Sequence, residues 1–293
     1  MSAVAPISVL PQGGRHRMRI VASVRTWILW ALLAFFLLNV LAIVVSALVD
    51  SFGTHWYNSW MPAGATLHWW AQISTYFDLG QVLVVTLEVA VIVVVVSLLI
   101  GVPSAYALAR RRFPGRGVLM LLFLLPVMLP PISYVIPLAT TLYDVHLGGT
   151  LAGVVIANMV PSVPFVVLVM TPFIEQLDPT LESAARMCGA RTRHIFTRVI
   201  GPLLVPGMMA AAILILIRTV GMFELTYFTA GPTDQTLIVS LYYAISGAGI
   251  RPPQVVDAVA VIYMLTTLIL LVIALRFVDP TQLVTRLKES PAE

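Results

Sequence analysis

The sequence has few charged residues and almost no lysine. Charged residues make up 10% of the 293 residues, and hydrophobic residues make up 59%. A soluble domain carries about 25% charged residues, so this composition indicates a membrane protein. The one lysine, Lys288, stands outside any G-x-x-x-x-G-K-[ST] sequence. The chain therefore lacks the P-loop with which many proteins bind ATP.

Residue types that carry catalysis and metal binding are scarce or scattered. The single cysteine, Cys188, excludes an internal disulfide and a cysteine-based metal site. The histidines form no H-x-x-x-H pair, and the sequence contains no G-x-S-x-G motif. We therefore expect no catalytic residue, no metal ligand and no cofactor bound by this chain.

Six apolar runs are long enough to cross a bilayer, since one crossing takes about 20 residues. They are Trp27–Val49, Val82–Leu108, Gly117–Leu142, Leu151–Phe173, Leu203–Phe228 and Val255–Ala274. Each run is continuous rather than alternating, so the spans are predicted to be helices. The predicted fold class is an all-α polytopic membrane protein with six transmembrane helices.

Arginines indicate on which side of the membrane each loop lies. Alternate loops and both tails carry them, whereas the intervening loops carry only Arg251. By the positive-inside rule, both termini and the hairpin at 178–206 lie in the cytoplasm. This topology also explains the formal charge of +4, so we expect no nucleic-acid partner. The basic residues of the inner segments are Arg15, Arg17, Arg19, Arg25, Arg110, Arg111, Arg112, Arg116, Arg186, Arg191, Arg193, Arg198, Arg276, Arg286 and Lys288.

The topology divides the chain into five parts. They are a cytoplasmic tail at 1–26, a first transmembrane helix at 27–49, an external tryptophan-rich loop at 50–80, a core of five transmembrane helices at 81–277 and a cytoplasmic tail at 278–293. The first helix lacks an evident small-x-small cleavage site and exceeds the length of a signal-peptide core. We therefore expect it to be retained as a span.

Two segments are expected to depart from simple spans. The third span carries four prolines, each of which removes a backbone donor, so this helix is expected to be kinked or broken. They are Pro126, Pro130, Pro131 and Pro137. The outer segment 231–253 is predicted to hold a short helix over its apolar run Thr236–Ile245.

The segment 178–206 is a polar, arginine-rich hairpin between two apolar spans. Asp178 is expected to cap its first helix, and Gly189 to end that helix in the left-handed conformation. The narrow apolar face of this helix is made of Leu181, Ala184, Ala185 and Cys188. A second short helix, with Ile195, Phe196, Val199 and Ile200 as its apolar side, is expected to stop at Gly201-Pro202. Such a hairpin on the basic side of a membrane protein indicates a docking surface.

Three ionisable residues, Glu88, Arg218 and Glu224, fall inside predicted spans. A charge at mid-bilayer costs about 2.5–3.5 kcal/mol, so each is expected to face protein or water. One interpretation is an ion pair of Arg218 with Glu88 or, across a helix break, with Glu224. The alternative is a polar pathway in which Glu224, Thr226 and Tyr227 attract a cationic or hydroxylated solute.

The hairpin resembles the EAA signature of ABC importer permeases. The resemblance is carried by Glu182-Ser183-Ala184-Ala185, Gly189-Ala190, Ile195-Phe196, Pro202 and Pro206. Ala105–Arg110 with Phe113–Arg116 resembles the family's stretch after the second span. The similarity covers residues 80–277 and leaves the first span as an extra N-terminal helix. Ser183 departs from the pattern, because the family often has glutamate directly before the two alanines.

This resemblance implies a type I ABC importer permease, a non-catalytic multi-pass subunit of the cytoplasmic (inner) membrane. The hairpin would then dock on a separate ATPase through Glu182, Ser183, Ala184, Ala185, Gly189 and Ala190. The implied partners are two copies of that ATPase, which bind ATP and Mg, and a second permease subunit that we expect to differ from this one. An external solute-binding protein and the lipid bilayer complete the set.

The resemblance also ranks the solutes. Phe223–Thr226 and Ser240–Tyr243 are similar to the spermidine/putrescine-type permeases, which favours a polyamine or a similar small organic solute. A carbohydrate ranks second, because the Trp-Asn pair usual in sugar importers is absent from span five. The candidate pathway residues are Glu88, Arg218, Phe223, Glu224 and Tyr227. An ion-coupled secondary transporter and a membrane-embedded structural component stay open as alternatives from other classes.

Overall fold

The computed structural model describes residues 13–56, 61–247 and 251–276, with residues 13–25 as backbone only. The chain divides into two compact units, Met1–Thr66 and Leu67–Glu293. The described part is built of helices and turns, with one isolated bridge between Gly53 and Ala65. The predicted all-α fold class is therefore confirmed. The predicted tail at 278–293 lies outside the described residues.

The first unit holds one long helix, α1 (Gly13–Phe52). Its segment Thr26–Phe52 is long and apolar enough to cross a membrane, in agreement with the predicted span 27–49. Large apolar side chains such as Trp27 and Phe35 are exposed along it. Lipid is the environment that suits a helix with such a surface.

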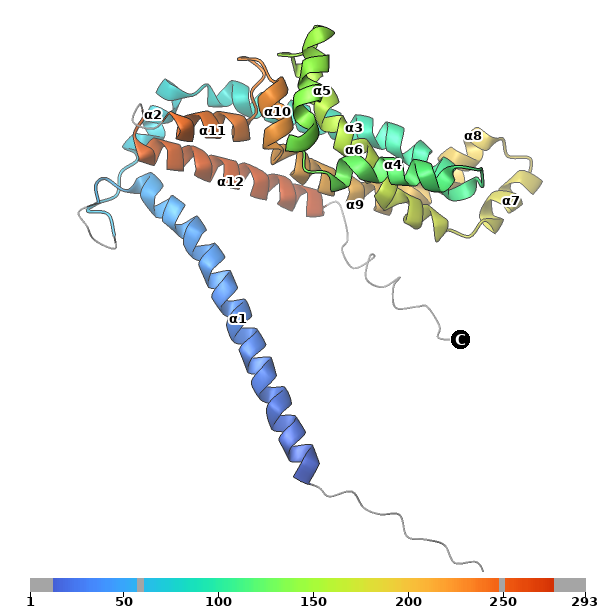
Figure 1. The fold of residues 1–293 in the computed structure, drawn as a ribbon, viewed down its shortest axis with the longest axis horizontal. Coiled ribbons are helices and arrows are strands. Elements are labelled where there is room, and N and C mark those ends of the chain that lie inside the picture. The colour runs from blue at the N-terminus through green and yellow to red at the C-terminus, as the bar shows by residue number, and fades with distance from the viewer. Residues whose placement is uncertain (1–12, 57–60, 248–250, 277–293) are drawn as a thin grey trace, which may run out of the picture. The chain divides into compact units, whose positions relative to one another are not determined.

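The second unit is built around three helices, α3 (Leu79–Arg110), α6 (Leu151–Glu175) and α9 (Gly201–Val220), which lie alongside one another (Figure 1). Asp78 and Thr150 cap α3 and α6 by accepting hydrogen bonds from the N–H groups of Gln81 and Gly153, respectively. The shared core is fully buried and aliphatic. It includes Val93, Val166, Val167, Met170, Ile174, Leu204 and Ile215.

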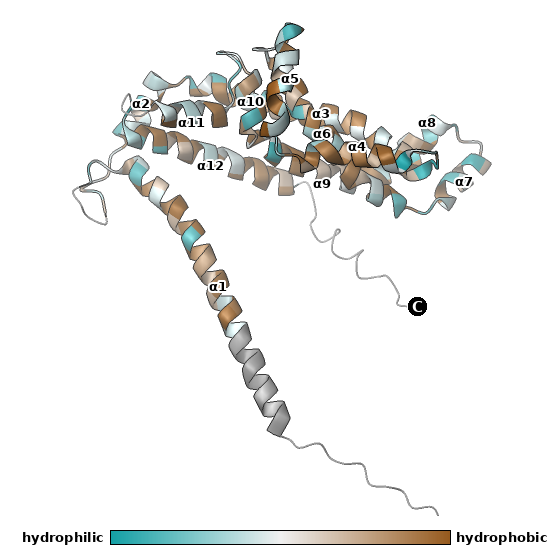
Figure 2. Ribbon diagram, viewed as in Figure 1, coloured by the Kyte–Doolittle hydropathy of each residue, from teal (hydrophilic) through white to brown (hydrophobic). Residues whose placement is uncertain are grey.

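The two ends of this unit differ in character. At one end α2 (His68–Tyr76), α11 (Leu237–Ser246) and α12 (Pro253–Arg276) share a second apolar cluster (Figure 1). Helix α11 confirms the short helix predicted in the outer segment. At the opposite end lie α7 (Thr180–Met187) and α8 (Thr192–His194), where Figure 2 shows polar residues gathering.

The third predicted span is broken. It forms α4 (Arg116–Met128) and α5 (Ile132–Asp144), which meet at an angle of 97°. Pro130 and Pro131 lie at the break, where two adjacent residues without N–H groups prevent the helix from continuing. The prediction of a kinked or broken helix is confirmed, and α5 stands across the bundle (Figure 1).

The fifth predicted span, Leu203–Phe228, is wrong at its outer end. Helix α9 ends at Val220, and a separate α10 (Phe223–Thr229) follows. Gly221 leaves the helix and Met222 is extended, with φ −79° and ψ 98°, so the hydrogen-bond ladder is interrupted. The described residues thus contain five helices able to span a membrane, or six when the bent α4–α5 pair counts as one span.

The contact of α3 with α6 depends on Gly101. A Cβ atom at this position would lie 2.6 Å from the Val166 side chain and 3.3 Å from the Val163 carbonyl oxygen. We expect Gly101→Ala to destabilise the protein by about 1–3 kcal/mol, because the two helices must separate. The apparent melting temperature of the purified protein in detergent measures this effect.

Gly117→Ala is the matched control. Gly117 lies in helix α4, and the space around its Cβ position is open. This variant is expected to be neutral or to stabilise the helix by up to about 1 kcal/mol. Equal melting temperatures for the two variants would contradict the role assigned to Gly101.

Candidate functional site

Helix α7 is held at both ends by local interactions. The Asp178 carboxylate accepts a hydrogen bond from the Thr180 N–H at 2.9 Å, which confirms Asp178 as the cap although the helix begins at Thr180. The hydrogen bonds from Thr180 lower the pKa of this exposed carboxyl. At the other end Gly189 has a φ of +76°, as predicted. The Ala190 N–H donates to the Ala185 carbonyl at 3.1 Å and closes a Schellman motif.

Helix α7 exposes several apolar side chains, flanked by the exposed polar residues Thr180, Ser183 and Arg186. Ala184 and Cys188 are exposed, Leu181 is 41% exposed and Met187 is 84% exposed. Ala185 instead packs against the core cluster, as does Ala190 beyond the turn. Sequence reasoning missed Met187, although its position three residues after Ala184 places it beside that residue on the helix. The exposed patch is available to a partner.

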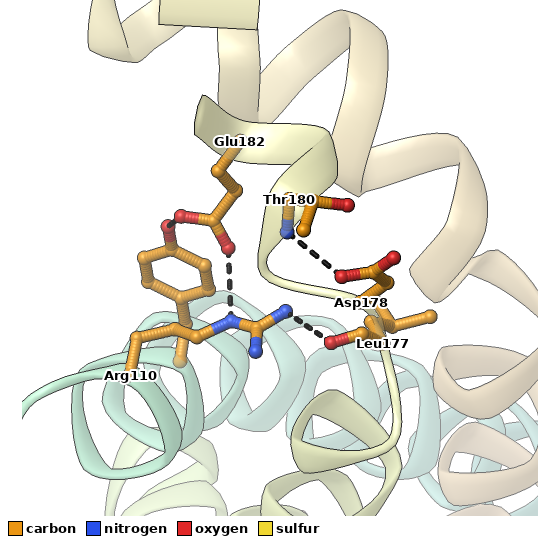
Figure 3. A network of polar contacts seen from close by, with 6 residues as sticks. Arg110, Leu177, Asp178, Thr180 and Glu182 are labelled. Carbon is orange, nitrogen blue, oxygen red and sulfur yellow. Dashed lines mark hydrogen bonds and ion pairs between the residues drawn. The ribbon is translucent and has the colours of Figure 1, made fainter. Parts of the chain in front are cut away.

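Glu182 points inward, toward α3. Its Oε1 lies 2.8 Å from Nε of Arg110, an ion pair without the geometry of a linear hydrogen bond. The Tyr106 hydroxyl donates to Oε2 of Glu182 at 2.8 Å. Figure 3 shows Arg110 reaching both Glu182 and the carbonyl oxygen of Leu177. Glu182 therefore has partners inside its own chain, while Ser183 and Gly189 are exposed.

The expectation that the second helix of the hairpin stops at Gly201-Pro202 is wrong. Helix α8 passes through a π-helix, η1 (Ile195–Ile200), directly into α9. The Gly201 N–H donates to the Phe196 carbonyl, five residues back. In an α-helix the ring of Pro202 would clash with the carbonyl four residues back, and the wider π register accommodates it. The second limb of the hairpin and the span therefore form one continuous rod, Thr192–Val220.

Gly201 is required for this π-helix. A Cβ atom on Gly201 would lie 2.7 Å from the Phe196 carbonyl oxygen. The predicted apolar side of the segment is confirmed: Ile195 and Ile200 are buried in the core cluster, and Phe196 and Val199 pack against it. The rod is thus anchored in the bundle before it enters the span.

Both predicted ion pairs of Arg218 are wrong. In the part of the chain that the structure describes, neither Glu88 nor Glu224 lies within ion-pair distance of Arg218. Glu88 is exposed on α3 beside exposed aliphatic residues. Arg218 is half-buried on α9, with its guanidinium 5.7 Å from the centre of the Phe165 ring. Glu224 is half-buried on α10, across the break at Gly221.

Tyr134 on α5 lies close to the break between α9 and α10, and sequence reasoning missed this residue. Its hydroxyl is buried without a hydrogen-bond partner among the described residues. The Tyr134 side chain packs against the cluster that contains Met222 and Leu225, on either side of Glu224 in the chain. The broken ends of two spans therefore converge on one polar region, a position where transporters place solute sites. The available signal was the position of Tyr134 in the first turn of helix after the Pro130-Pro131 break.

An aromatic cluster lies next to this region. Tyr227 lies 5.1 Å from Phe223, 5.2 Å from Phe228 and Tyr242, and 5.6 Å from Tyr243, measured between ring centres. Tyr242 and Tyr243, from α11, are 41% and 43% exposed. Thr226 points away from the cluster: it is buried, and Asn158 lies 3.3 Å from its hydroxyl. Its predicted role in the pathway is therefore not supported by its position.

No group of three or more His, Cys, Asp or Glu residues is placed to hold a metal ion within residues 13–56, 61–247 and 251–276. The remaining features are a helical membrane bundle with two broken spans, two charges beside the break at Gly221 that form no ion pair among the described residues, and an exposed hairpin whose second limb is continuous with one span. These features define a multi-pass membrane protein of the transporter class.

Comparison with known proteins identifies the family. Residues 97–283 match the family described as binding-protein-dependent transport system inner membrane component. The chain belongs to this family. The predicted resemblance to ABC importer permeases is therefore confirmed, whereas similarity to the spermidine type in particular is not shown.

The matched relatives are named for different transported substances. The trehalose transport system permease protein SugB of Mycobacterium tuberculosis is 34% identical over 47% of this chain and 50% of its own length. The molybdenum transport system permease protein ModB of Escherichia coli is 31% identical over 56% of this chain and 79% of its own length. The chain thus spans about half the length of the first relative and most of the second.

A solved structure shares the fold. It is a chain of a bacterial ABC transporter involved in the import of the acidic polysaccharide alginate, with a TM-score of 0.71 and 20% sequence identity. The alignment covers 93% of this chain and all of that one. This agreement supports the six-helix architecture with an extra N-terminal helix.

The backbone at Gly189 yields a testable prediction. No atom lies within 4 Å of its Cβ position, so only the left-handed backbone restricts this residue. We expect Gly189→Val to destabilise the turn by about 1–2 kcal/mol. Gly189→Asn should cost less, since asparagine tolerates this conformation. Amide hydrogen exchange over residues 180–190 compares the variants, and equal exchange in both would contradict this account.

Proposed function

We propose that this chain is the transmembrane permease subunit of an ATP-driven, binding-protein-dependent importer. The observation that carries the proposal is the exposed apolar face of α7 on a hairpin that runs without a stop into α9. Such a face outside the bundle needs a protein partner. Because the chain lacks a P-loop, the partner is an ATPase that binds ATP and Mg itself.

In this mechanism the chain converts motion of the ATPase into motion of its spans. Two ATPase copies close on ATP and displace the coupling hairpin on the cytoplasmic side. Since α8, η1 and α9 form one rod, the displacement reaches the break at Gly221 and the polar region beyond it. Rocking against a second, different permease subunit then opens the pathway outward, toward a solute-binding protein. Both termini lie in the cytoplasm.

This proposal is tested by isolating the tagged chain from its native membrane. We expect an ATPase to co-purify, and Gly189→Val to lower its recovery or to uncouple ATP hydrolysis from uptake. Gly189→Asn serves as the control at the same surface position. An ion-coupled transporter would instead keep its uptake in vesicles without the ATPase and lose it on addition of an ionophore, and that outcome would refute the proposal.

For the solute, we place a carbohydrate first. The tyrosines of the aromatic cluster offer flat faces that carry hydroxyl groups, and Tyr242 and Tyr243 are partly exposed, an arrangement that suits a hydroxylated ring. Relatives named for trehalose and diacetylchitobiose support this choice. A polyamine is the second candidate, because Glu224 forms no ion pair in the described chain and aromatic rings attract cations. A sulfate permease among the relatives shows that the family name alone does not select the solute.

Glu224→Gln separates the two solute classes. For a cationic solute, uptake should fall about tenfold, since a hydrogen bond to a charged group contributes about 1.5–3 kcal/mol. For a carbohydrate, uptake should fall far less, whereas Tyr242→Ala should reduce it. Asp234→Asn, in the neighbouring loop, is the charge-matched control. Radiolabelled uptake in vesicles measures all three variants, and unchanged uptake in both test variants would remove these residues from the pathway.

A further inference from the structure

The inner end of α3 holds both limbs of the hairpin. Arg110 and Tyr106 both contact the Glu182 carboxylate, one at each oxygen, at 2.8 Å. The second branch of the Arg110 guanidinium donates to the Leu177 carbonyl at 2.8 Å. The Tyr106 ring meets Phe196 of η1 edge-on, with 5.5 Å between ring centres. We call Tyr106, Arg110 and Glu182 the α3 clamp.

The clamp is shielded from solvent. The side chains of Arg110 and Glu182 are 13% and 12% exposed. Salt screens partly buried charges much less than exposed ones, so this pair persists at physiological ionic strength. Arg110 uses its forked guanidinium to bridge the loop before α7 and the first turn of α7 (Figure 3).

Helix α7 depends on contacts with the rest of the chain for its stability. It has eight residues, and isolated helices of this length are not stable in water. Its outer face is exposed, and its inner face offers the small Ala185 to the core. The α3 clamp therefore supplies the charged contact that fixes the position of α7 on the bundle.

We propose that Tyr106 and Arg110 are positioning residues for coupling, which transmit displacement of α7 to α3 while η1 transmits it to α9. This inference rests on the proposed function, in which α7 docks on an ATPase. The two routes end on different spans, so the hairpin moves α3 and α9 together. Without the clamp, the turns on either side of α7 absorb the displacement that would otherwise reach α3.

The first test uses the full chain alone in lipid nanodiscs and needs no partner. In Arg110→Gln, the amides of α7 should exchange about tenfold faster, an effect between those of exposed and buried ion pairs. Arg110→Lys should lie between the wild type and Arg110→Gln, because lysine keeps the charge but lacks the fork. Tyr106→Phe should also accelerate exchange.

Arg112→Gln is the matched control. Arg112 is an exposed arginine two residues further on, and it forms no ion pair in the described part of the chain. Its α7 amides should exchange as in the wild type. Unchanged exchange in α6 shows that each variant is folded. Wild-type exchange of α7 in Arg110→Gln would overturn the clamp, whatever the partners of this chain are.

The second test uses the complex that co-purifies with the tagged chain. Spin labels are placed singly, by Gln81→Cys at the far end of α3 or by Leu214→Cys on α9. Each stands in a Cys188→Ser background, which must first recover the ATPase as the wild type does because Cys188 lies on the exposed face of α7. On addition of ATP and vanadate, the spectrum of each spin label should change in the complex that keeps Arg110. Arg110→Gln should largely abolish the response on α3 and keep the response on α9.

The outcomes separate the two proposals. If Arg110→Gln keeps both responses, or loses both, the α3 clamp does not act as a separate route and the inference is overturned. If the labelled complex that keeps Arg110 shows no spectral change at either label, the proposed function fails. The exchange experiment then decides whether the clamp exists.

Discussion

The structure depends on one constraint of the bilayer: a backbone N–H or C=O group left unpaired in hydrocarbon costs several kcal/mol. A long continuous helix without an internal proline meets this requirement by itself, as α12 does. In α3 and α6 internal prolines free single carbonyl groups, which neighbouring groups must cover. The exceptions are therefore informative. The spans are broken at Pro130-Pro131 and at Gly221-Met222. The two breaks lie close together, since Tyr134 of α5 packs against Met222 and Leu225 at the start of α10.

The same requirement shapes the junction between hairpin and span. A proline at this point would normally end the helix. Widening to a π-helix keeps the hydrogen-bond ladder running to Gly201 and beyond. The absence of a side chain on Gly201 permits the close approach to Phe196. The helix therefore continues from the hairpin into the span because Gly201, which precedes Pro202, has no side chain.

Features that depend on neighbouring residues were predictable from the sequence. The long apolar runs, the cap at Asp178, the left-handed Gly189 and the broken third span each follow from residues close together in the chain. The helix over Thr236–Ile245 belongs to the same group. Features that depend on tertiary contacts were not predictable. The inward turn of Glu182 requires Arg110, more than seventy residues earlier, and no local pattern indicates that pairing.

The errors at the fifth span have the same origin. Apolar residues dominate from Leu203 to Phe228 in spite of Arg218 and Glu224, so hydropathy alone predicts one span across Gly221. The ion pairs expected for Arg218 assumed that charges in spans neutralise one another. Instead Arg218 lies over an aromatic ring, and Glu224 keeps a separate position on α10. The EAA resemblance identified the family from the hairpin, which explains why the family was predictable and the solute was not.

The exposed Leu181 and Met187 also bear on the life of the subunit before assembly. Until a partner covers them, the chain displays an apolar patch in water at one end of a membrane-embedded bundle. Such patches promote aggregation and attract quality-control proteases. For a chain with this exposed patch, synthesis in excess of a covering partner therefore favours aggregation or proteolysis.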